Sequence, residues 1–594
     1  MSTASSTQPP PVQAIPRQGF LKQVILLAGP YWKCEHCWKV RGAAALLLIL
    51  TIGQVALSVW SNYWRGALFD ALEQHSISRL LIQIGVFVLI FLLSIVITGG
   101  HLLIKRWLQM DWRAWLTDQL VNRWMEGGRF YRLLHTPGDH DNPDQRIAED
   151  IRIATEIAVA LWHTLVYSLL SVGLFIDILW SVSGSVNIPG TGIHIPGYMV
   201  ILAFLYAALG SVFGWMMGRP LVSSTNALQN AEATFRFGLS RVRENPEAIA
   251  LMRGEPLEKN RSSNRFLEII RQWNRQSMAY MGLVAFGTGY GLLLPIFPIL
   301  VAAPQYIRGV MTLGLLMQAA EAFQRLTSAL SWPVDNIGEM ARCRASAERV
   351  LSLYQAMQDV DDCGRGSGHV CIVVERSQRS RLVIQNLCIA EPSGRVLLEH
   401  FHADFRRGER VLLTGDPEVT SSLFKVLAGL WLWGSGKVIT PPIEDMMFIT
   451  QRPFLYEGVL REVLCYPHPA DGFDPSVVRH ALECSGLAWI ASRLDDHDNW
   501  EQVLPQRSQQ RLCFARALIQ KPSWICMQEV LDAFSPKGAR IVFEMLRREL
   551  PNTTLLNISF QAGLRTLHHR TVALGRARSA KMLEPDDSEE SGGF

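Results

Sequence analysis

Charge is scarce in this sequence, and neither sign prevails. Only 19% of the 594 residues are charged while 49% are hydrophobic, and the mean hydropathy is +0.13. An ordinary soluble protein is less apolar, and a chain of this length exceeds a single domain. Lys and Arg (57) nearly balance Asp and Glu (53), so we expect no nucleic-acid partner. The composition favours a membrane part joined to a soluble part.

The cysteines form no regular framework. All ten fall in segments that we place on the cytoplasmic side below, where thiols stay reduced, so we expect no disulfides. The one C-x-x-C pair, Cys34 and Cys37 with His36 between them, lacks a second pair at the spacing of a zinc site. We therefore predict no metal centre.

The amino-terminal end lacks the apolar segment of a secretory signal. It is rich in Ser and Pro, so residues 1–40 are predicted to contain a flexible tail and a first helix. Residues 579–594 include the acidic stretch EPDDSEESGGF and are predicted to be a solvated tail.

Six apolar runs are long enough to cross a membrane, which takes about 20 residues each. The sixth is interrupted by Gln318, Glu321, Gln324 and Arg325, as expected if one of its faces lines water instead of lipid. The runs predict a six-helix transmembrane domain over 41–335, in contact with membrane lipid and with both ends on one side. They cover 43–61, 80–104, 157–182, 198–217, 281–303 and 307–331.

Positive charge indicates which side that is. Most Lys and Arg of this half lie in the long connections 105–156 and 218–280, whereas the alternate connections carry only Arg65, Arg79 and Arg308. Basic connections stay in the cytoplasm, so we expect both termini there. The long connections keep helical periodicity and are predicted to be helices that leave the membrane and turn back, at 135–144 and near Asn245 and Pro246.

The soluble half is predicted to be an α/β domain over 371–578, after a linker at 336–370. Its strand-like runs alternate with turns and helices, which is typical of a P-loop domain with a mixed sheet. The strand-like runs are CIVVE, RLVIQNL, RVLLTG, MMFIT, WICM and TTLLNI.

The run VLLTGDPEVTSSLFKVLAGLW, residues 411–431, has the strand, turn and helix in which G-x-x-x-x-G-K-[ST] holds phosphates. Counting from Gly415, Thr420 occupies the place of the second glycine and Ser421 the place of the lysine, so only Ser422 fits. Within the turn, a proline at 417 removes a backbone donor and a glutamate at 418 adds negative charge beside the phosphates. The sequence therefore keeps the strand, the turn and the helix of a phosphate-binding loop but has Ser421 in place of the lysine.

Several longer motifs resemble the SbmA/BacA-like permease family, which consists of exporter-fold half-transporters related to the peroxisomal fatty-acyl ABC transporters. The resemblance covers nearly the whole chain. It rests on NYWRGALFDAL (62–72), DNPDQRIAEDI (141–151), RENPEAIALMRGE (243–255), APQYIRGVMTLGLLMQAAEAFQRLTSALSW (303–332), GRVLLEHF (394–401), AGLW (428–431), QRPFLYEGVLREVLCYP (451–467) and QQRLCFARALIQKPSW (509–524).

This resemblance implies a homodimer in the inner (plasma) membrane. Two six-helix halves would enclose a cavity that opens to each side in turn, above two nucleotide domains. Glu247, Gly254 and Glu255 lie in the segment that would couple the two halves. The implied cargoes are peptide-like, cobalamin-like or acyl compounds, and one branch of the family has no nucleotide domain and uses proton flow.

The resemblance also implies ATP and Mg²⁺ as cofactors, but further family residues are replaced. The signature L-S-x-G-E-Q-Q-R has Pro505 and Arg507 in place of its serine and glycine. Gln528 replaces the aspartate linked to Mg²⁺, and the switch histidine is missing near Gln561, whereas Glu529 keeps the place of the water-orienting glutamate. Since one lost donor can cost a factor of about 10²–10³ in rate, we expect hydrolysis to be lost.

Nucleotide binding without hydrolysis stays open at this stage. Gly415, Ser421, Ser422 and Gln528 would form a vestigial nucleotide site, together with Gln451 at the family's Mg²⁺-sensing position. Glu529 is the one candidate catalytic residue.

Three functions fit the sequence. The first is a transporter of exporter fold with a mainly structural nucleotide domain. The second is a proton-coupled secondary transporter, for which the candidate groups are Asp177 and Glu321, acids among apolar neighbours. The third is a membrane scaffold or regulator that moves no cargo. Neither the cargo nor the direction of transport follows from the residues.

Overall fold

The structure is a computed structural model, and it describes residues 20–33, 37–136, 142–187, 194–362, 371–377 and 381–575. Cys34, His36 and the predicted acidic tail lie outside the described residues. So do most of the predicted flexible tail and the middle of the predicted turn at 135–144.

The chain forms two compact units. The first comprises Met1–Leu120 and Asn142–Leu351, and the second comprises Val121–Asp141 and Ser352–Phe594. Residues 121–136 group with the second unit, and helix α12 (Ile337–Asp362) is divided between the two units after Leu351. The domain boundaries expected from the sequence stay predictions.

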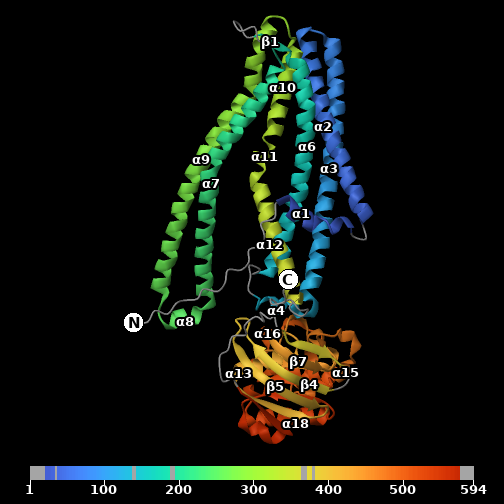
Figure 1. The fold of residues 1–594 in the computed structure, drawn as a ribbon, viewed down its shortest axis with the longest axis vertical. Coiled ribbons are helices and arrows are strands. Elements are labelled where there is room, and N and C mark those ends of the chain that lie inside the picture. The colour runs from blue at the N-terminus through green and yellow to red at the C-terminus, as the bar shows by residue number, and fades with distance from the viewer. Residues whose placement is uncertain are drawn as a thin grey trace, which may run out of the picture. The chain divides into compact units, whose positions relative to one another are not determined.

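The first unit is helical (Figure 1). The glycines and prolines inside α7 and α9 do not break those helices, as is common for helices of membrane proteins. Its main elements are α1 (Phe20–Ala28), α2 (Cys37–Glu73), α3 (Ile77–Met125), α6 (Ile151–Ser183), α7 (Tyr198–Glu244), α8 (Pro246–Leu251), α9 (Glu255–Ile307), α10 (Leu313–Leu330) and α11 (Trp332–Asp335), with a hairpin of β1 (Ser185–Asn187) and β2 (His194–Pro196).

Within the described ranges, five helices are long and apolar enough to cross a membrane. They contain the first five predicted spans. The sixth predicted span corresponds to α10, which is not among them because four polar residues interrupt it. Most of α10 between Gly314 and Thr327 is buried against α2, α6, α7 and α9. Its surroundings are therefore protein instead of lipid, which explains why a strongly polar sequence is tolerated.

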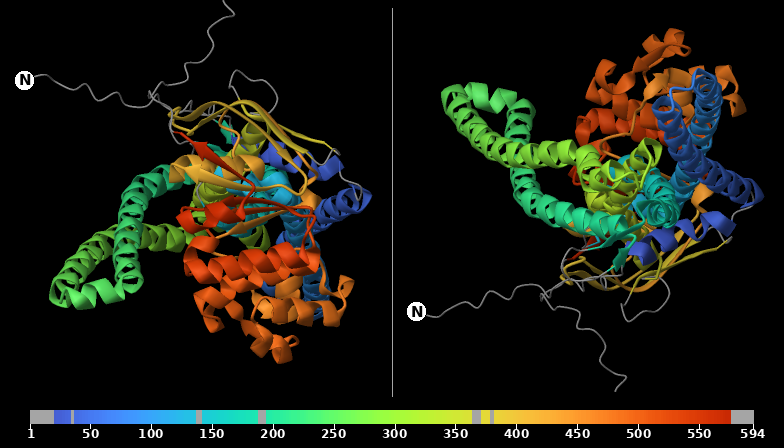
Figure 2. Two further views of the ribbon diagram at one scale, coloured as in Figure 1. Left: turned by 90° about the horizontal axis from the view of Figure 1, so that it is seen from below. Right: turned by 90° about the horizontal axis from the view of Figure 1, so that it is seen from above.

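The predicted extension of the apolar helices is confirmed. Helices α3, α7 and α9 run on without a break well past their apolar stretches. Helices α7 and α9 pack along each other as a long arm, joined at its tip by α8 (Figures 1 and 2). The predicted break at Asn245 is present, since α7 ends at Glu244 and Asn245 has φ −125°.

Helix α10 is fixed against α2 by a close backbone approach. Gly66 and Gly314 face each other, and the amide of Gly314 donates a 3.0 Å hydrogen bond to Asp70 Oδ1. One turn further on, Asn62 Nδ2 donates a 3.0 Å hydrogen bond to the carbonyl of Gln318. The two glycines allow the backbones to approach, and the two hydrogen bonds fix the position of α10 against α2 among apolar side chains.

The Gly314→Ala variant should be less stable by about 1–3 kcal/mol, because it overpacks this contact. An added Cβ would lie 2.2 Å from the Gly66 carbonyl oxygen and 2.4 Å from Asp70 Oδ1. The measurement is thermal unfolding of the purified protein in detergent. Gly173→Ala in α6 is the control, since nothing lies within 4 Å of its added Cβ. Equal stability of the two variants would contradict the contact.

The second unit is an α/β domain with two main sheets. The five-stranded sheet is parallel and has the order β13-β6-β12-β11-β8, and the four-stranded sheet has the order β3-β7-β4-β5. The strands are β3 (Val373–Arg376), β4 (Arg381–Ala390), β5 (Val396–Arg406), β6 (Arg410–Gly415), β7 (Gly434–Thr440), β8 (Met446–Thr450), β9 (Glu457–Val459), β10 (His497–Asn499), β11 (Trp524–Gln528), β12 (Thr554–Ile558) and β13 (Arg570–Leu574).

The predicted strands at RVLLTG and MMFIT match β6 and β8 to the residue. The apolar strands β11 and β12 are almost entirely buried, as expected in a parallel sheet covered on both faces. The prediction missed β5, β7 and β13, whose residues are more polar or rich in glycine. The principal helices are α13 (Pro417–Leu427), α14 (Leu460–Cys465), α15 (Pro475–Cys484), α17 (Gln506–Gln520) and α18 (Pro536–Glu549).

Candidate functional site

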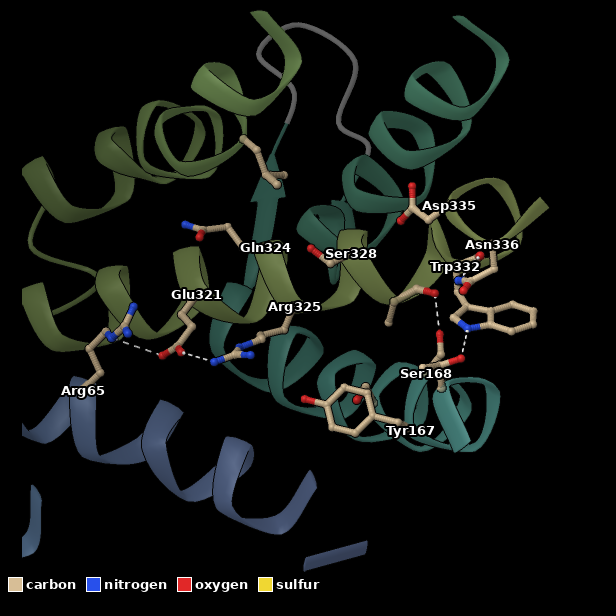
Figure 3. Close-up of a pocket in the computed structure, with 14 residues that line it drawn as sticks. Arg65, Tyr167, Ser168, Glu321, Gln324, Arg325, Ser328, Trp332, Asp335 and Asn336 are labelled. Atoms are coloured by element: carbon tan, nitrogen blue, oxygen red, sulfur yellow. Dashed lines mark hydrogen bonds and ion pairs between the residues drawn. The ribbon is translucent and has the colours of Figure 1, made fainter. Parts of the chain in front are cut away.

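A cavity of about 500 Å³ lies within the helical unit, between α2, α6, α10 and α11 (Figure 3). Its wall is mostly polar although the surrounding helices are apolar. Hydrogen bonds between helices fix the wall, since Ser168 Oγ donates to the carbonyl of Ala329 (2.6 Å) and Trp332 Nε1 donates to Thr164 Oγ1 (3.0 Å). Its charged and amide-bearing lining residues are Arg65, Glu321, Gln324, Arg325, Asp335 and Asn336.

Glu321 lies between two arginines at one end of this cavity (Figure 3). Its side chain is almost fully buried, and its oxygens are 3.3 Å from Arg65 Nε and 3.5 Å from Arg325 Nη2. Both arginine side chains keep about two fifths of their surface exposed. One carboxylate cannot neutralise two guanidinium groups, so this end has a net positive charge and spare N–H donors for an anionic group.

The other end of the cavity carries Asp335 and Asn336 (Figure 3). The cavity is thus positive at the Glu321 end and offers a carboxylate at the other. Asp177, the second acid suggested by the sequence, is exposed on α6 and does not line this cavity. The structure separates the two candidate transport residues.

The nucleotide-site candidates gather at one edge of the parallel sheet. Gln528 is in register with Thr450 on β8 and with Ile558 on β12, and Ile558 is in register with Leu413 on β6. The carboxyl ends of these strands therefore meet. Gly415 and Gln528 are the last residues of β6 and β11, and Gln451 and Glu529 directly follow β8 and β11. This edge is where open α/β sheets bind ligands.

Gly415 keeps the tight turn of a phosphate-binding loop. Its φ is +146°, and an added Cβ would lie 2.1 Å from the carbonyl oxygen of Leu574 on β13. Only glycine fits this position. The strand-to-turn frame is therefore retained.

The chain beyond Gly415 forms an ordinary capped helix instead of a phosphate loop. Helix α13 begins at Pro417, three residues before Thr420, so Thr420 and Ser421 lie inside it. The side chain of Asp416 accepts a 2.9 Å hydrogen bond from the amide of Glu418, and its carbonyl accepts one of 3.0 Å from the amide of Thr420. These amides already have partners within the chain. Ser422 is also buried.

The glutamate introduced into the turn is held by an arginine. Arg395 forms ion pairs with both Glu418 and Glu391. The hydrogen bond from Arg395 is the main cause that lowers the pKa of Glu391 to about 2. This arginine has two carboxylate partners inside the domain, so it does not replace the missing lysine as a free cation.

The remaining positions support the same conclusion. The amide of Glu529 donates a 2.9 Å hydrogen bond to the carbonyl of Ile558, and Gln561 Nε2 donates one of 2.9 Å to the carbonyl of Phe534. Helix α17 begins at Gln506 with Pro505 as its cap. No charged group stands in the aspartate position, which Gln528 occupies, so a hard cation lacks its usual anchor. The residues present do not fit Mg·ATP.

The coupling candidates lie at the tip of the α7–α9 arm. Glu247 is in α8, Gly254 precedes α9, and Glu255 is the first residue of α9. Beside them Leu251 and Met252 are exposed by 78% and 81%. Both are large apolar side chains at the end of the arm.

Sequence analysis missed a ring cluster in the second unit. His135 contacts Trp431 and Trp433 edge-to-face, with ring centroids 5.2 and 5.9 Å apart. Burial, and then the charge of Lys425, lowers the pKa of His135. The AGLW motif pointed to Trp431, but no sequence pattern predicts its contact with His135, which lies almost 300 positions earlier. This cluster seats segment 121–136 on the α/β domain.

The Asp416→Ala variant should lose about 1 kcal/mol of stability, because the substitution removes an ordinary helix cap. Asp474→Ala is the matched variant, since Asp474 caps α15 in the same way with a 2.8 Å bond from Ser476 N. Thermal unfolding should shift by similar amounts in the two variants, with and without Mg·ATP. A stabilising effect of Mg·ATP that Asp416→Ala alone removes would contradict this reading.

Residues 27–294 match the family described as ABC transporter transmembrane region 2. Over most of its length the chain is similar to the inner membrane ABC transporter ATP-binding protein YddA of Escherichia coli (strain K12), with 28% identity over 553 residues, or 92% of this chain and 96% of the relative.

Two eukaryotic proteins are also similar. The chloroplastic ABC transporter D family member 2 of Arabidopsis thaliana is 25% identical over 625 residues, which cover 94% of this chain and 86% of the relative. ATP-binding cassette sub-family D member 3 of Homo sapiens is 24% identical over 494 residues, which cover 77% and 73%.

Proposed function

We propose that this chain, a relative of ABC transporters with an ABC transporter transmembrane region over residues 27–294, is one half of a homodimeric transporter of exporter fold whose nucleotide domain no longer hydrolyses ATP. Helix α10 serves as the sixth span, and both termini lie in the cytoplasm. An inner (plasma) membrane location is supported by the printed name of the Escherichia coli relative. The exposed Leu251 and Met252 at the tip of the arm support a second copy as partner.

The cavity between α2, α6, α10 and α11 carries this proposal. A cavity with fixed charges, lined by the membrane-spanning helices α2 and α6 together with α10 and α11, is expected for the path of a polar cargo. A protein whose helical unit served only as an anchor would have no use for such a cavity.

The charges of the cavity favour a peptide-like cargo among the classes considered. Arg65 and Arg325 would bind a carboxylate, and Asp335 at the other end would bind an amino group. A peptide carries both groups, whereas an acyl compound carries only the acid. A cobalamin-like molecule would leave Asp335 without a cationic partner.

The loss of hydrolysis is supported by the nucleotide edge. A transferring γ-phosphoryl group needs free amides, a cation and an anchored Mg²⁺. Here the amides of Glu418 and Thr420 are bonded within the chain, Arg395 is held by two carboxylates, and Gln528 replaces the aspartate. The α/β domain then has a structural role, holding segment 121–136 through His135.

A proton-coupled mechanism is the second candidate, because Glu321 is a buried carboxyl group in the wall of the cavity. In that case an imposed pH gradient would drive uptake, and Glu321→Gln would abolish the coupling. A scaffold that moves no cargo would show no flux under either driving force.

Uptake of a radiolabelled tripeptide with free ends into proteoliposomes should fall about 10-fold to 100-fold in the Arg325→Ala variant, since a charge-assisted hydrogen bond contributes about 1.5–3 kcal/mol. Arg308→Ala is the control, because Arg308 is exposed in the connection before α10. Equal uptake by the two variants, or no uptake by the unchanged protein, would refute the assignment of the cavity.

Phosphate release from ATP by the purified protein in nanodiscs should stay at the level of a protein-free blank. The Glu529→Gln variant should give the same value, because no ATP is bound next to the Glu529 carboxylate for it to hydrolyse. Hydrolysis that this substitution abolishes would show that Glu529 is catalytic and that the proposal is wrong.

A further inference from the structure

Three side chains with metal-binding atoms converge on the surface of the α/β domain, away from the strand ends that carry the nucleotide-site candidates. His480 and Cys484 are one turn apart on α15, and Glu549 is the last residue of α18 (Figure 1). Residues four apart on a helix share a face, so the histidine and cysteine point the same way. The glutamate comes from a second helix.

The distance between the sulfur of Cys484 and the imidazole of His480 matches that of two ligands on one ion. Cys484 Sγ lies 3.5 Å from His480 Nε2, and His480 Nε2 lies 3.8 Å from Glu549 Oε2. All three ligand atoms lie within 4.8 Å of one another. With metal–ligand lengths of about 2.3 Å for sulfur and about 2.0 Å for nitrogen, a tetrahedral zinc ion places these two atoms about 3.5 Å apart.

The two helices hold this cluster firmly. Val478, Ala481 and Leu482 of α15 are buried in the core, as are Phe543 and Leu546 of α18. The ligand-bearing face of each helix is therefore fixed by the packing of the opposite face. A site built on packed helices keeps its geometry better than one on a loop.

An arginine orients the glutamate. Arg548 Nη2 lies 2.9 Å from Glu549 Oε1, whereas the other oxygen, Oε2, is directed to His480. Second partners of this kind commonly orient metal ligands. The positive charge of Arg548 also weakens cation binding, which favours an exchangeable ion over a permanent structural one.

We propose that His480, Cys484 and Glu549 form a zinc site with one position left for water. Sulfur and imidazole ligands select zinc over Mg²⁺ and Ca²⁺, which prefer oxygen. An ion pair between His480 and Glu549 alone would be a weak surface contact. A metal ion would bind both of these groups and also the sulfur, which lies against the imidazole.

The test is a titration of the full-length protein, purified in detergent and freed of metal, with Co²⁺ as a coloured substitute for zinc. Cys34→Ser with Cys37→Ser provides the background, so that the amino-terminal pair does not contribute. We expect one equivalent to bind with a thiolate-to-cobalt absorption band that Zn²⁺ abolishes.

In this background Cys484→Ser should remove the band. His480→Ala should weaken zinc binding more than the roughly 10-fold to 100-fold typical of losing a second-shell partner. Arg548→Ala should strengthen binding, and Cys388→Ser is the control thiol. Thermal unfolding without metal checks that each variant is folded. Absence of the band in the background protein, or its persistence in Cys484→Ser, would overturn the proposal.

Discussion

The start of helix α13 determines how the α/β domain can work. A helix amino terminus attracts anions because its first amides are free and its dipole is positive there. In this chain the side chain of Asp416 accepts a hydrogen bond from one of those amides, that of Glu418. The side chain of Glu418 places a second carboxylate in the first turn. Internal negative charge thus occupies the place that phosphate takes in a nucleotide-binding loop. A polyanion would meet both carboxylates and find no lysine to offset them.

The frame around this point is intact even though its chemistry has changed. Gly415 still makes its turn against Leu574, and β6, β8, β11 and β12 still end in one row. Such a sheet is stabilised by burial, which does not depend on the lost polar groups. The domain can therefore persist as a support for segment 121–136 without binding nucleotide. The helical unit has a cavity lined by charged residues, whereas the α/β domain has a buried sheet without the residues that would bind Mg·ATP.

Much of this was predictable where local sequence decides the outcome. The strands at RVLLTG and MMFIT, the long helices and the replaced residues at 421 and 528 could be read directly. The partners of those residues could not, because they come from distant positions. Arg395 reaches Glu418 across 23 positions, Glu549 meets His480 through the packing of two helices, and α10 is buried only because other helices surround it. The polar interruptions of α10 predicted that one of its faces lines water, and Glu321, Gln324 and Arg325 do line the polar cavity. The helices that bury the rest of α10 could not be predicted from hydropathy, and spacing alone gave no sign of the zinc ligands.

The central claim is that the start of α13 leaves no place for a polyphosphate, because Asp416 already bonds the amides of Glu418 and Thr420 and no lysine offsets the carboxylates there. Calorimetric titration of the purified full-length protein with Mg·ATP tests this most directly. The account predicts no saturable heat up to millimolar nucleotide. Saturable binding at micromolar concentrations that disappears when Mg²⁺ is removed would contradict it.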